Sequence, residues 1–588
     1  MTGLLKVFLA LACLAGMAPL ALGADPSSQV GRLNLISGAV SFQPATVDEW
    51  SPASLNYPIT VGDHLWTDSG AKAELHLGNA VLRLGANTEF SFLSLDDQTV
   101  QVSLTQGTLQ VVVRGLGNGA VFEIDTPNSS VRILQAGAYR FDVQPNGETD
   151  LTVRTGLAEL HAGQNAANLS GGQAATVSGF DANSFRFQIS RAASADDWDN
   201  WCSGRDRLER QYQSSPYVSS EMIGSEDLGR YGTWAEVSGY GPGWTPNNVP
   251  AGWVPYRDGH WSWVEPWGWT WIDDSSWGFA PFHYGRWAFA GARWIWFPGT
   301  TVQRPVYAPA LVVFIGGSDW SPNSVHSIGW FPLAPHEVYY PPYHSSPEYV
   351  QRINRESVPN IAKLQSVPQD SGRIKYVNNS DSRAVTVVSS QAFVQSQHVG
   401  RSVMQLPPAA LARAPVTGTQ ANLAPQHESI VAGRLPSQRA VSQPPAALAK
   451  RQVQTRTVPQ NTRAPFVQNT QSVPQNRQPA VQPKQPPATR APSVQQKPPQ
   501  VNREPPVQQK PPQVNHAPAV QQKPPQATRA PSIQQKPPAN DGRSGKMTAP
   551  QPDNQPPAVQ NGPRKPSPSP DPRDQRNDSP GSRSGRLD

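Results

Sequence analysis

The chain has 588 residues, of which 62 are prolines and only two are cysteines, and its net charge is +6. Cys13 lies in an N-terminal apolar stretch, so Cys202 is the only cysteine in the rest of the chain. A framework of intrachain disulfides is therefore excluded, and the folded part must rely on packing. The charge is divided, since residues 401–588 hold 25 lysines and arginines against 8 acidic residues (+17), whereas the first 400 residues carry −11. This asymmetry indicates an acidic folded body followed by a basic interaction tail.

Residues 1–24 predict a secretory signal peptide. Lys6 precedes an apolar stretch that ends in small residues around Gly23 and Ala24, which is the pattern of a cleaved signal. The stretch is shorter than the roughly 20 apolar residues that span a bilayer, and the residues before Cys13 fit a lipid-attachment signal poorly. We therefore expect an exported protein of the bacterial periplasm or cell surface, with no transmembrane segment after signal cleavage.

The next segment, residues 25–190, has the pattern of many short β-strands. Turn residues recur at roughly ten-residue spacing, and apolar residues alternate between the turns. Examples of the alternating positions are Leu75/Leu77, Val100/Val102 and Phe122/Ile124. This pattern predicts an all-β sandwich or barrel-like domain with one face of each strand buried, and a short β-solenoid is the alternative.

Part of this segment resembles the FecR family. The stretch GDHLWTDSGAKAELHLGNAVLRLGANTEF is similar to that family's opening pattern, VFEIDTPNSSVRILQAGAYRFDV to its middle and LTVRTGLAEL to its closing strands, so the resemblance covers about residues 60–178. FecR-type regulators of iron-citrate uptake combine a cytoplasmic segment that acts on a sigma factor, one membrane span and a periplasmic β region. The chain resembles only the last part, so the resemblance implies a periplasmic β domain and does not carry over the anti-sigma role.

Residues 191–225 are predicted to link this domain to the next. Trp198, Trp201, Leu208 and Tyr212 recur at helical spacing, and Ser194 precedes them as a candidate N-cap. We expect one short helix whose tryptophans pack on its own domain. An interaction helix with exposed tryptophans is the alternative.

Residues 226–400 are predicted to form a Trp-rich β-hairpin repeat domain with a short extension. Fourteen of the 18 tryptophans lie between residues 234 and 330, where one pattern occurs three times with a period of 26 to 27 residues. Each copy has an aromatic strand, a turn and a second aromatic strand, which indicates a β-hairpin. The Gly-x-Trp pairs of the copies are Gly232/Trp234, Gly259/Trp261 and Gly285/Trp287.

The aromatic residues of this region have two interpretations. Cross-strand aromatic pairs stabilise a small sheet by roughly 0.2 to 1 kcal/mol each, which favours a core alone. The alternative adds a platform on which sugar rings of peptidoglycan or a surface polysaccharide stack. The candidate platform residues are Trp261, Trp263, Trp269, Trp271, Tyr284, Trp287 and Trp294.

The same region resembles a Tyr-x-x-Gly-x-Trp repeat domain of unknown function that follows FecR-like domains in some secreted bacterial proteins. The resemblance rests on EDLGRYGTW, GWVPYRDGHW, GWTWID, WGFAPFHYGRW, WIWFPG and IGWFPLAPHEVYYPPY, in this order, over about residues 226–345. IKYVNNSDSRAVTVVSSQAF, from residue 374, looks like a short extension of the same family. The resemblance implies an architecture and no activity.

Residues 401–588 are predicted to be a disordered, basic Pro/Gln-rich tail. They contain 37 prolines and one aromatic residue, Phe466, so they cannot bury enough apolar area to offset chain entropy. Repeats of 13 residues over 481–538 are either an extended spacer or a multivalent contact to anionic envelope polymer. The candidate contact residues are the repeated lysines, Lys484, Lys497, Lys510, Lys523 and Lys536.

The sequence carries no catalytic signature. Gly-x-Ser-x-Gly, His-Glu-x-x-His, Cys-x-x-Cys and phosphate-loop motifs are absent. Asp273 and Asp274 fit a turn better than a carboxylate pair, and His260 and His283 lack metal-ligand spacing. We therefore expect no enzyme activity, no catalytic residue, no metal and no cofactor.

Two functions remain. The first is a non-enzymatic envelope binding or scaffold protein that contacts peptidoglycan, a polysaccharide or an envelope protein. The alternative is a FecR-like sensory or regulatory partner that acts through another membrane protein. Nucleic acid is not expected as a partner, because the protein is exported and its tail lacks the interleaved aromatic residues of single-strand binders.

Overall fold

The computed structural model describes residues 24–180, 184–212, 215–359, 361, 374–431 and 441–458. The predicted signal peptide up to residue 23 and the five repeat lysines lie outside these residues. The fold is mainly β with few helices, as predicted, and all described residues belong to one compact unit.

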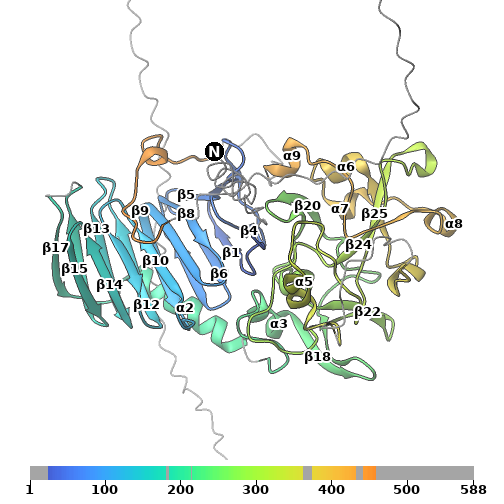
Figure 1. Cartoon of the computed structure of the whole chain (residues 1–588), viewed down its shortest axis with the longest axis horizontal. Coiled ribbons are helices and arrows are strands. Elements are labelled where there is room, and N and C mark those ends of the chain that lie inside the picture. Colours follow the sequence, from blue (N-terminus) through green and yellow to red (C-terminus); the bar gives the residue numbers. More distant parts are fainter. Residues whose placement is uncertain are drawn as a thin grey trace, which may run out of the picture. The chain divides into compact units, whose positions relative to one another are not determined.

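Residues 31–191 form the predicted β-sandwich (Figure 1). The chain alternates between the two layers, and all neighbouring strands are antiparallel except β9 and β10. Sheet A has the strand order β4 (Pro58–Ile59), β1 (Gly31–Ser37), β6 (Lys72–Leu77), β7 (Ala80–Leu84), β9 (Thr99–Val113), β12 (Gly137–Val143), β13 (Thr149–Thr155), β16 (Gln173–Ser178) and β17 (Arg186–Arg191). Sheet B has the order β3 (Ser51–Pro52), β2 (Val40–Gln43), β5 (His64–Thr67), β8 (Thr88–Leu95), β9, β10 (Val121–Asp125), β11 (Ser130–Ile133), β14 (Leu157–Ala162) and β15 (Asn165–Ser170).

Strand β9 belongs to both sheets. Its first half pairs with β8 and β10, and its second half pairs with β7 and β12. The halves meet at Gly107, where φ is 99° and a Cβ would collide with Thr88. Only glycine adopts this conformation without strain, so Gly107 allows one strand to cross from sheet to sheet.

Alternation along the strands decides which side chains face the core. Leu75 and Leu82 point inward and are fully buried in the sandwich core. Their neighbours Glu74, His76 and Arg83 therefore point to the outer face of sheet A. These three side chains are nevertheless at most 2% exposed, because other parts of the chain cover this face.

Two helices follow the sandwich, α2 (Asp197–Tyr212) and α3 (Ser225–Tyr231). The predicted helix is present, but its predicted apolar face is wrong in part, because Leu208 is 44% exposed whereas Glu209 is buried. The sheet face beneath α2 is charged, so the helix turns an acidic side chain toward it. Trp198 and Trp201 stack with ring centroids 5.0 Å apart and lie half-buried beside Lys72, as expected for packing on their own domain.

The three predicted hairpins are present in the second domain. They are formed by β18 (Gly232–Val237) with β19 (Gly241–Pro246), β20 (Gly259–Val264) with β21 (Gly268–Asp273), and β22 (Arg286–Ala290) with β23 (Arg293–Phe297). The first and third join in one sheet in the order β18-β19-β23-β22. A further hairpin, β24 (Val312–Gly317) with β25 (Ser327–Pro332), is extended on its two sides by β27 (Val416–Gly418) and β26 (Thr386–Ser389).

Short helices lie between these strands or follow the last of them. They are α4 (Ala280–His283), η1 (Pro322–Ser324), α5 (Pro347–Asn354), η4 (Asn378–Ser380), α6 (Ser390–Val394), α7 (Val399–Ser402), α8 (Pro408–Leu411), α9 (His427–Ile430) and η5 (Leu448–Lys450).

The predicted start of the disordered tail at residue 401 is wrong. Residues 401–431 and 441–458 include α8, α9 and η5, and β27 pairs with β24. Apolar side chains such as Val403, Leu406 and Leu423 lie between the prolines and pack against the core. Composition averaged over the whole tail hides these few anchors.

Candidate functional site

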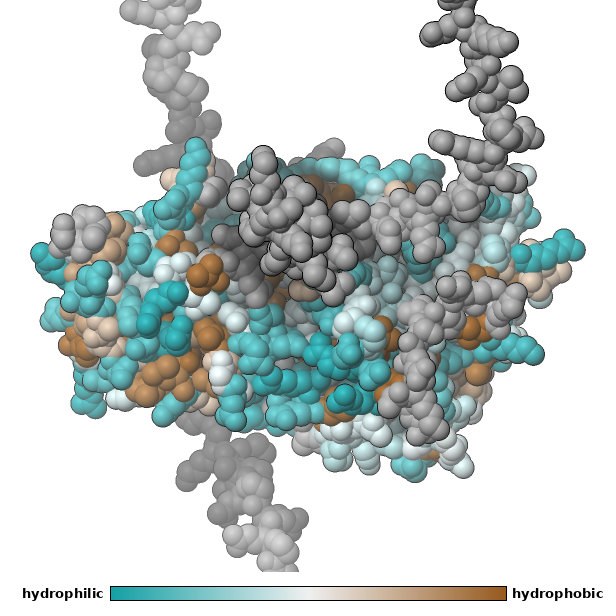
Figure 2. All heavy atoms as spheres, viewed as in Figure 1, coloured by the Kyte–Doolittle hydropathy of each residue, from teal (hydrophilic) through white to brown (hydrophobic). Residues whose placement is uncertain are grey.

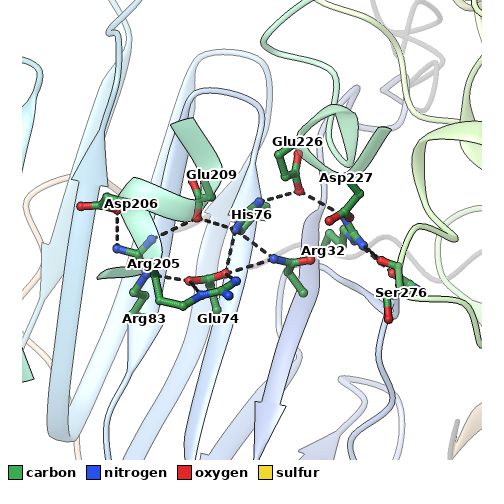
Figure 3. Close-up of polar contacts among 12 residues, drawn as sticks. Arg32, Glu74, His76, Arg83, Arg205, Asp206, Glu209, Glu226, Asp227 and Ser276 are labelled. Atoms are coloured by element: carbon green, nitrogen blue, oxygen red, sulfur yellow. Dashed lines mark hydrogen bonds and ion pairs between the residues drawn. The ribbon is translucent and has the colours of Figure 1, made fainter. Parts of the chain in front are cut away.

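A network of buried charges lies between the outer face of sheet A and helices α2 and α3 (Figure 3). It contains five basic side chains, one of which is His76, and five acidic side chains. We call it the charge network, and its members are Arg32, Glu74, His76, Arg83, Arg114, Arg205, Asp206, Glu209, Glu226 and Asp227.

Arg83 joins the sheet to helix α2. Its Nε lies 2.7 Å from Glu74 Oε2, its Nη1 2.7 Å from Asp206 Oδ1 and its Nη2 3.0 Å from Glu209 Oε1. Arg205 from the same helix reaches Glu74 Oε1 at 2.6 Å. The Arg83 guanidinium is thus fully enclosed by three carboxylates, which offsets the cost of burying it.

His76 lies at the centre of the network. Its Nδ1 is 2.7 Å from Glu226 Oε1, and its Nε2 is 3.1 Å from Glu74 Oε1 and 3.3 Å from Glu209 Oε1. Burial alone would lower the pKa of His76, but the carboxylates of Glu226 and Glu209 outweigh it and raise the pKa well above 6.5. The imidazole is therefore charged at neutral pH, and both ring nitrogens donate.

Arg32 and Asn56 extend the network to the second domain. Arg32 Nη1 lies 3.0 Å from Glu226 Oε1 and 2.6 Å from Asp227 Oδ2, and its Nη2 donates to the Ser276 carbonyl at 2.8 Å. Asn56 accepts from Arg32 Nε at 3.0 Å and donates to the carbonyls of Asp273 and Ser275, both at 2.8 Å. The turn after β21 is thus bonded to the first strand of the sandwich.

The pKa values of the carboxylates in the charge network shift in different directions, depending on their surroundings. Burial would raise the pKa of Glu74, but His76 and other ion-pair partners hold it well below 4.5, and His76 with Arg32 likewise lowers the pKa of Glu226 to about 2. Asp227 is the exception, since burial and the adjacent Glu226 charge outweigh Arg32 and raise its pKa to about 6.

Substitution of His76 by glutamine is expected to change the pH dependence of stability. The folded pKa of His76 is raised above 6.5, so its stabilising contribution is complete below pH 6.5 and is lost as the pH rises through the folded pKa. In urea unfolding, the stability gap between wild type and His76→Gln should be widest below pH 6.5 and should narrow at higher pH. The exposed His344→Gln is the control, and a His76→Gln gap that does not change with pH would contradict a charged imidazole.

Metal binding is not favoured by this geometry. Glu74, His76 and Glu209 place three ligand atoms within 4.8 Å of one another, but Glu74 already accepts from Arg83 and Arg205. A cation would be repelled by these guanidinium groups, so the cluster is suited to ion pairing.

The residues near the second hairpin fit a turn. Asp273 Oδ1 accepts from the Ser275 amide at 3.0 Å, as predicted for turn chemistry. Asp258, Asp274 and His398 form a half-exposed group of potential ligand atoms. His283 lies elsewhere, fully buried with Nδ1 2.7 Å from the Ala308 carbonyl.

The structure contradicts an open stacking platform at most of the predicted aromatic residues. Trp261, Trp271 and Trp287 are at most 1% exposed, and Trp269 is 8% exposed. Stacking of a sugar needs an accessible ring face, which these side chains lack. Among the other predicted residues Trp263 is half-buried, and the buried ones are Tyr284 and Trp294.

The indole N–H groups show what the tryptophans do instead. Trp287 donates to the Pro281 carbonyl at 2.8 Å, and Trp269 donates to the Leu423 carbonyl at 2.9 Å. These two rings therefore pack in the core, and each indole N–H bonds its ring to another segment. On the face drawn in Figure 2, hydrophobic residues are scattered among hydrophilic ones.

The repeated Gly-x-Trp pattern has a steric cause. In each hairpin a glycine at or just before the start of the first strand lies against a tryptophan of the second strand, so no Cβ fits there. The pairs are Gly232/Trp244, Gly259/Trp271 and Gly285/Trp296. The sequence signal for a hairpin is thus also a packing signal.

Substitution of Gly259 by alanine is expected to destabilise the chain by about 2 kcal/mol, because the new Cβ would lie 2.8 Å from Trp271 Cζ2 and against the Ile272 carbonyl. Urea unfolding followed by tryptophan fluorescence measures the loss. Gly115→Ala is the control, since nothing lies within 4 Å of its Cβ position. Equal stabilities of the two variants would contradict the packing explanation.

A cavity of about 590 Å³ opens in the second domain. Trp253, Phe289 and the predicted Trp294 line it together with Arg257, whose guanidinium donates to Thr386 Oγ1 at 3.2 Å. Burial lowers the pKa of Arg257. The lining is mostly apolar, and its charged side chains are Arg257, Arg293 and Arg383, so this cavity offers apolar and cationic binding contacts.

Two protein families match the chain. The FecR protein family matches residues 63–159, and a family of unknown function, DUF6600, matches residues 225–337. No curated protein matches. Two crystal structures of a "putative anti-sigma factor" from Parabacteroides distasonis are similar at 16% and 15% identity; they cover 27% and 30% of this chain and 80% and 94% of their own, each with a TM-score of 0.21.

The part of the sandwich from β5 into β14 thus carries the match to the FecR family, and we refer to the sandwich as the FecR domain. The match to DUF6600 follows it, beginning at α3 and ending after β25. The two matches confirm both resemblances and their order. Within the described residues, no helix has the length and apolar character needed to cross a membrane.

Proposed function

We propose that the chain is a non-enzymatic binding and scaffold protein of the bacterial cell envelope, in which the FecR domain and the Trp-rich domain act as one rigid body. The charge network carries this proposal. It is buried, it draws on three strands and two helices, and Arg32 and Asn56 bond it to the second domain. A buried network holds one geometry because any displaced partner leaves an unpaired charge.

A protein partner fits this arrangement better than a glycan. The aromatic rings that would stack on sugars are mostly buried, whereas the FecR domain belongs to a family associated with the envelope. A fixed spacing between two β domains is useful to a scaffold that holds partners apart.

Co-sedimentation of the purified full chain tests the proposal. We expect the chain to sediment with isolated cell envelopes and to remain in the supernatant when the envelopes are first treated with protease. The control variant is Glu236→Gln, at an exposed position of β18, which should sediment like wild type. Sedimentation with protein-free sacculi would show that the partner is a polymer and not a protein. Failure to sediment with any envelope fraction would overturn the scaffold function.

The FecR domain also favours a second function, regulation through another envelope protein. Deletion of the gene should then change the expression of sigma-factor-dependent genes, measured by RNA sequencing. An unchanged expression profile would rule out the regulatory function, and only the scaffold function would remain.

A further inference from the structure

The cavity of the second domain has the size of a small-molecule site. Its volume of about 590 Å³ falls within the range of about 300 to 1,000 Å³ that such sites occupy. Four segments line it, namely the end of β19 with the loop that follows, the β22–β23 hairpin, residues 382–387 and residues 403–411. The last two segments lie outside the DUF6600 match, so residues beyond the matched region complete the cavity.

The wall of the cavity supplies apolar contacts. Trp253 and Phe289 are half-buried, in contrast to the fully buried Trp271 of the second hairpin. Leu406 and Leu411 line the same cavity and are also half-buried. These side chains therefore keep part of their apolar surface open to a ligand.

The charged side chains of the lining, among the described residues, are all arginines. Arg383 has its own counter-charge, because its Nη2 lies 2.7 Å from Asp381 Oδ2. The Arg383 guanidinium also covers the Phe289 ring, with its central carbon 4.4 Å from the ring centroid. Arg293 is exposed at the start of β23.

Arg257 differs from Arg383 because neutral groups hold it. Its Nε donates to Thr386 Oγ1 at 3.2 Å, and its Nη2 donates to the Val385 carbonyl at 3.3 Å. Within the part of the chain that the structure describes, Arg257 has no ion-pair partner and its Nη1 has no hydrogen-bond acceptor. The two bonds fix the guanidinium at the cavity wall, and its positive charge stays uncompensated there.

We propose that this cavity binds a small amphipathic organic anion, whose negatively charged head group pairs with Arg257 and whose apolar body lies against Trp253 and Phe289. A hydrogen bond between a guanidinium and an anion is stronger than one between neutral groups, so the head group adds affinity and orients the ligand. A neutral molecule of the same shape gains the apolar contacts alone. This site goes beyond the proposed scaffold function, and its test requires no envelope partner.

Two fluorescent dyes with the same aromatic body test the proposal on the full chain. ANS (8-anilino-1-naphthalenesulfonate) carries a sulfonate, and NPN (N-phenyl-1-naphthylamine) lacks it. Titration followed by dye fluorescence gives both dissociation constants. We expect one ANS site per chain and an affinity for ANS about tenfold or more above that for NPN.

Substitution of Arg257 by glutamine separates the head group from the apolar body. Arg257→Gln should weaken ANS binding by about tenfold and leave NPN binding unchanged. Arg413→Gln is the matched control, because Arg413 is exposed, follows the lining segment and does not line the cavity. Arg257→Lys keeps the charge if the glutamine variant does not fold, and it should bind ANS within about threefold of wild type.

The wall and the natural class of body are tested in the same assay. Trp253→Ala should weaken both dyes, because it removes apolar contacts that the dyes share. Decanoate and naphthalene-2-carboxylate are added as competitors of ANS. Displacement by decanoate would indicate an acyl body, displacement by naphthalene-2-carboxylate an aromatic one, and displacement by neither would overturn the proposal.

Three further results would overturn it. Equal affinities of wild type for ANS and NPN would show that the head group is not recognised. Equal weakening of ANS binding by Arg257→Gln and Arg413→Gln, or no effect of Trp253→Ala on either dye, would place the dyes elsewhere. Loss of both dyes in both Arg257 variants would assign Arg257 a structural role only.

Discussion

Arg83→Met is expected to lower the free energy of unfolding by about 3 to 5 kcal/mol. Arg83 is fully buried and pairs with Glu74, Asp206 and Glu209, so its removal leaves buried carboxylates without their main counter-charge. Methionine fills much of the same volume, so the loss reports the charge and not a cavity. Urea unfolding at pH 7 measures it.

Arg207→Met is the matched control, because Arg207 lies on the same helix α2 and is exposed. We expect its effect to stay within about 0.5 kcal/mol. A loss for Arg83→Met that is no greater than for Arg207→Met would show that the charge network does not stabilise the fold.

Trp271→Ala is expected to cost about 3 to 5 kcal/mol. Trp271 is fully buried in the second hairpin, packs edge-on against Trp261 with ring centroids 5.5 Å apart, and donates to Asp273 Oδ2 at 3.1 Å. Its loss would leave a large cavity and would free the Asp273 carboxylate that shapes the turn next to Asn56.

Trp263→Ala, in the same hairpin but half-buried, should cost less than half as much. Trp271→Phe keeps most of the packing and covers the case in which the alanine variant does not fold. Urea unfolding of the three variants ranks them, and a ranking in which Trp263 matters more than Trp271 would contradict the assignment of Trp271 to the core.

The hairpins and the sandwich were predictable because their signal is local. Alternating apolar positions such as Leu75 and Leu82 report the buried face of a strand, and Gly259 before Trp261 reports close packing across a hairpin. These features depend on residues that are near one another in the sequence.

The charge network was not predictable in the same way. Glu74, His76 and Arg83 occupy the outward positions of their strands, which is the pattern of a solvated surface. They are buried because helices α2 and α3 cover them, with Arg205 and Glu209 of α2 and Glu226 of α3 turned toward the sheet. The sequence held one signal for this burial. One face of helix α2 is charged, and it lies opposite the charged residues of the hairpin formed by β6 and β7.

Which tryptophans are buried, and the contacts of residues 451–457 with sheet B, could not be predicted for a related reason. Aromatic periodicity shows that Trp261 and Trp271 share a face, but burial depends on Phe393 and other residues far along the chain. Residues 451–457 are flanked by proline-rich sequence, and their order depends on contacts such as those of Arg456 and Thr457 with Glu159 and Glu123, which lie far away in the sequence.

Coincidence of unfolding transitions tests the rigid two-domain unit most directly. Tryptophan fluorescence reports mainly the Trp-rich domain, which holds 14 of the 18 tryptophans, and amide hydrogen exchange in β12 and β13 reports the FecR domain. With increasing urea, both probes should show one common midpoint in wild type, and the midpoints should separate in Arg32→Gln. Two separate midpoints in the wild-type chain would contradict the claim that the charge network joins the domains into one unit.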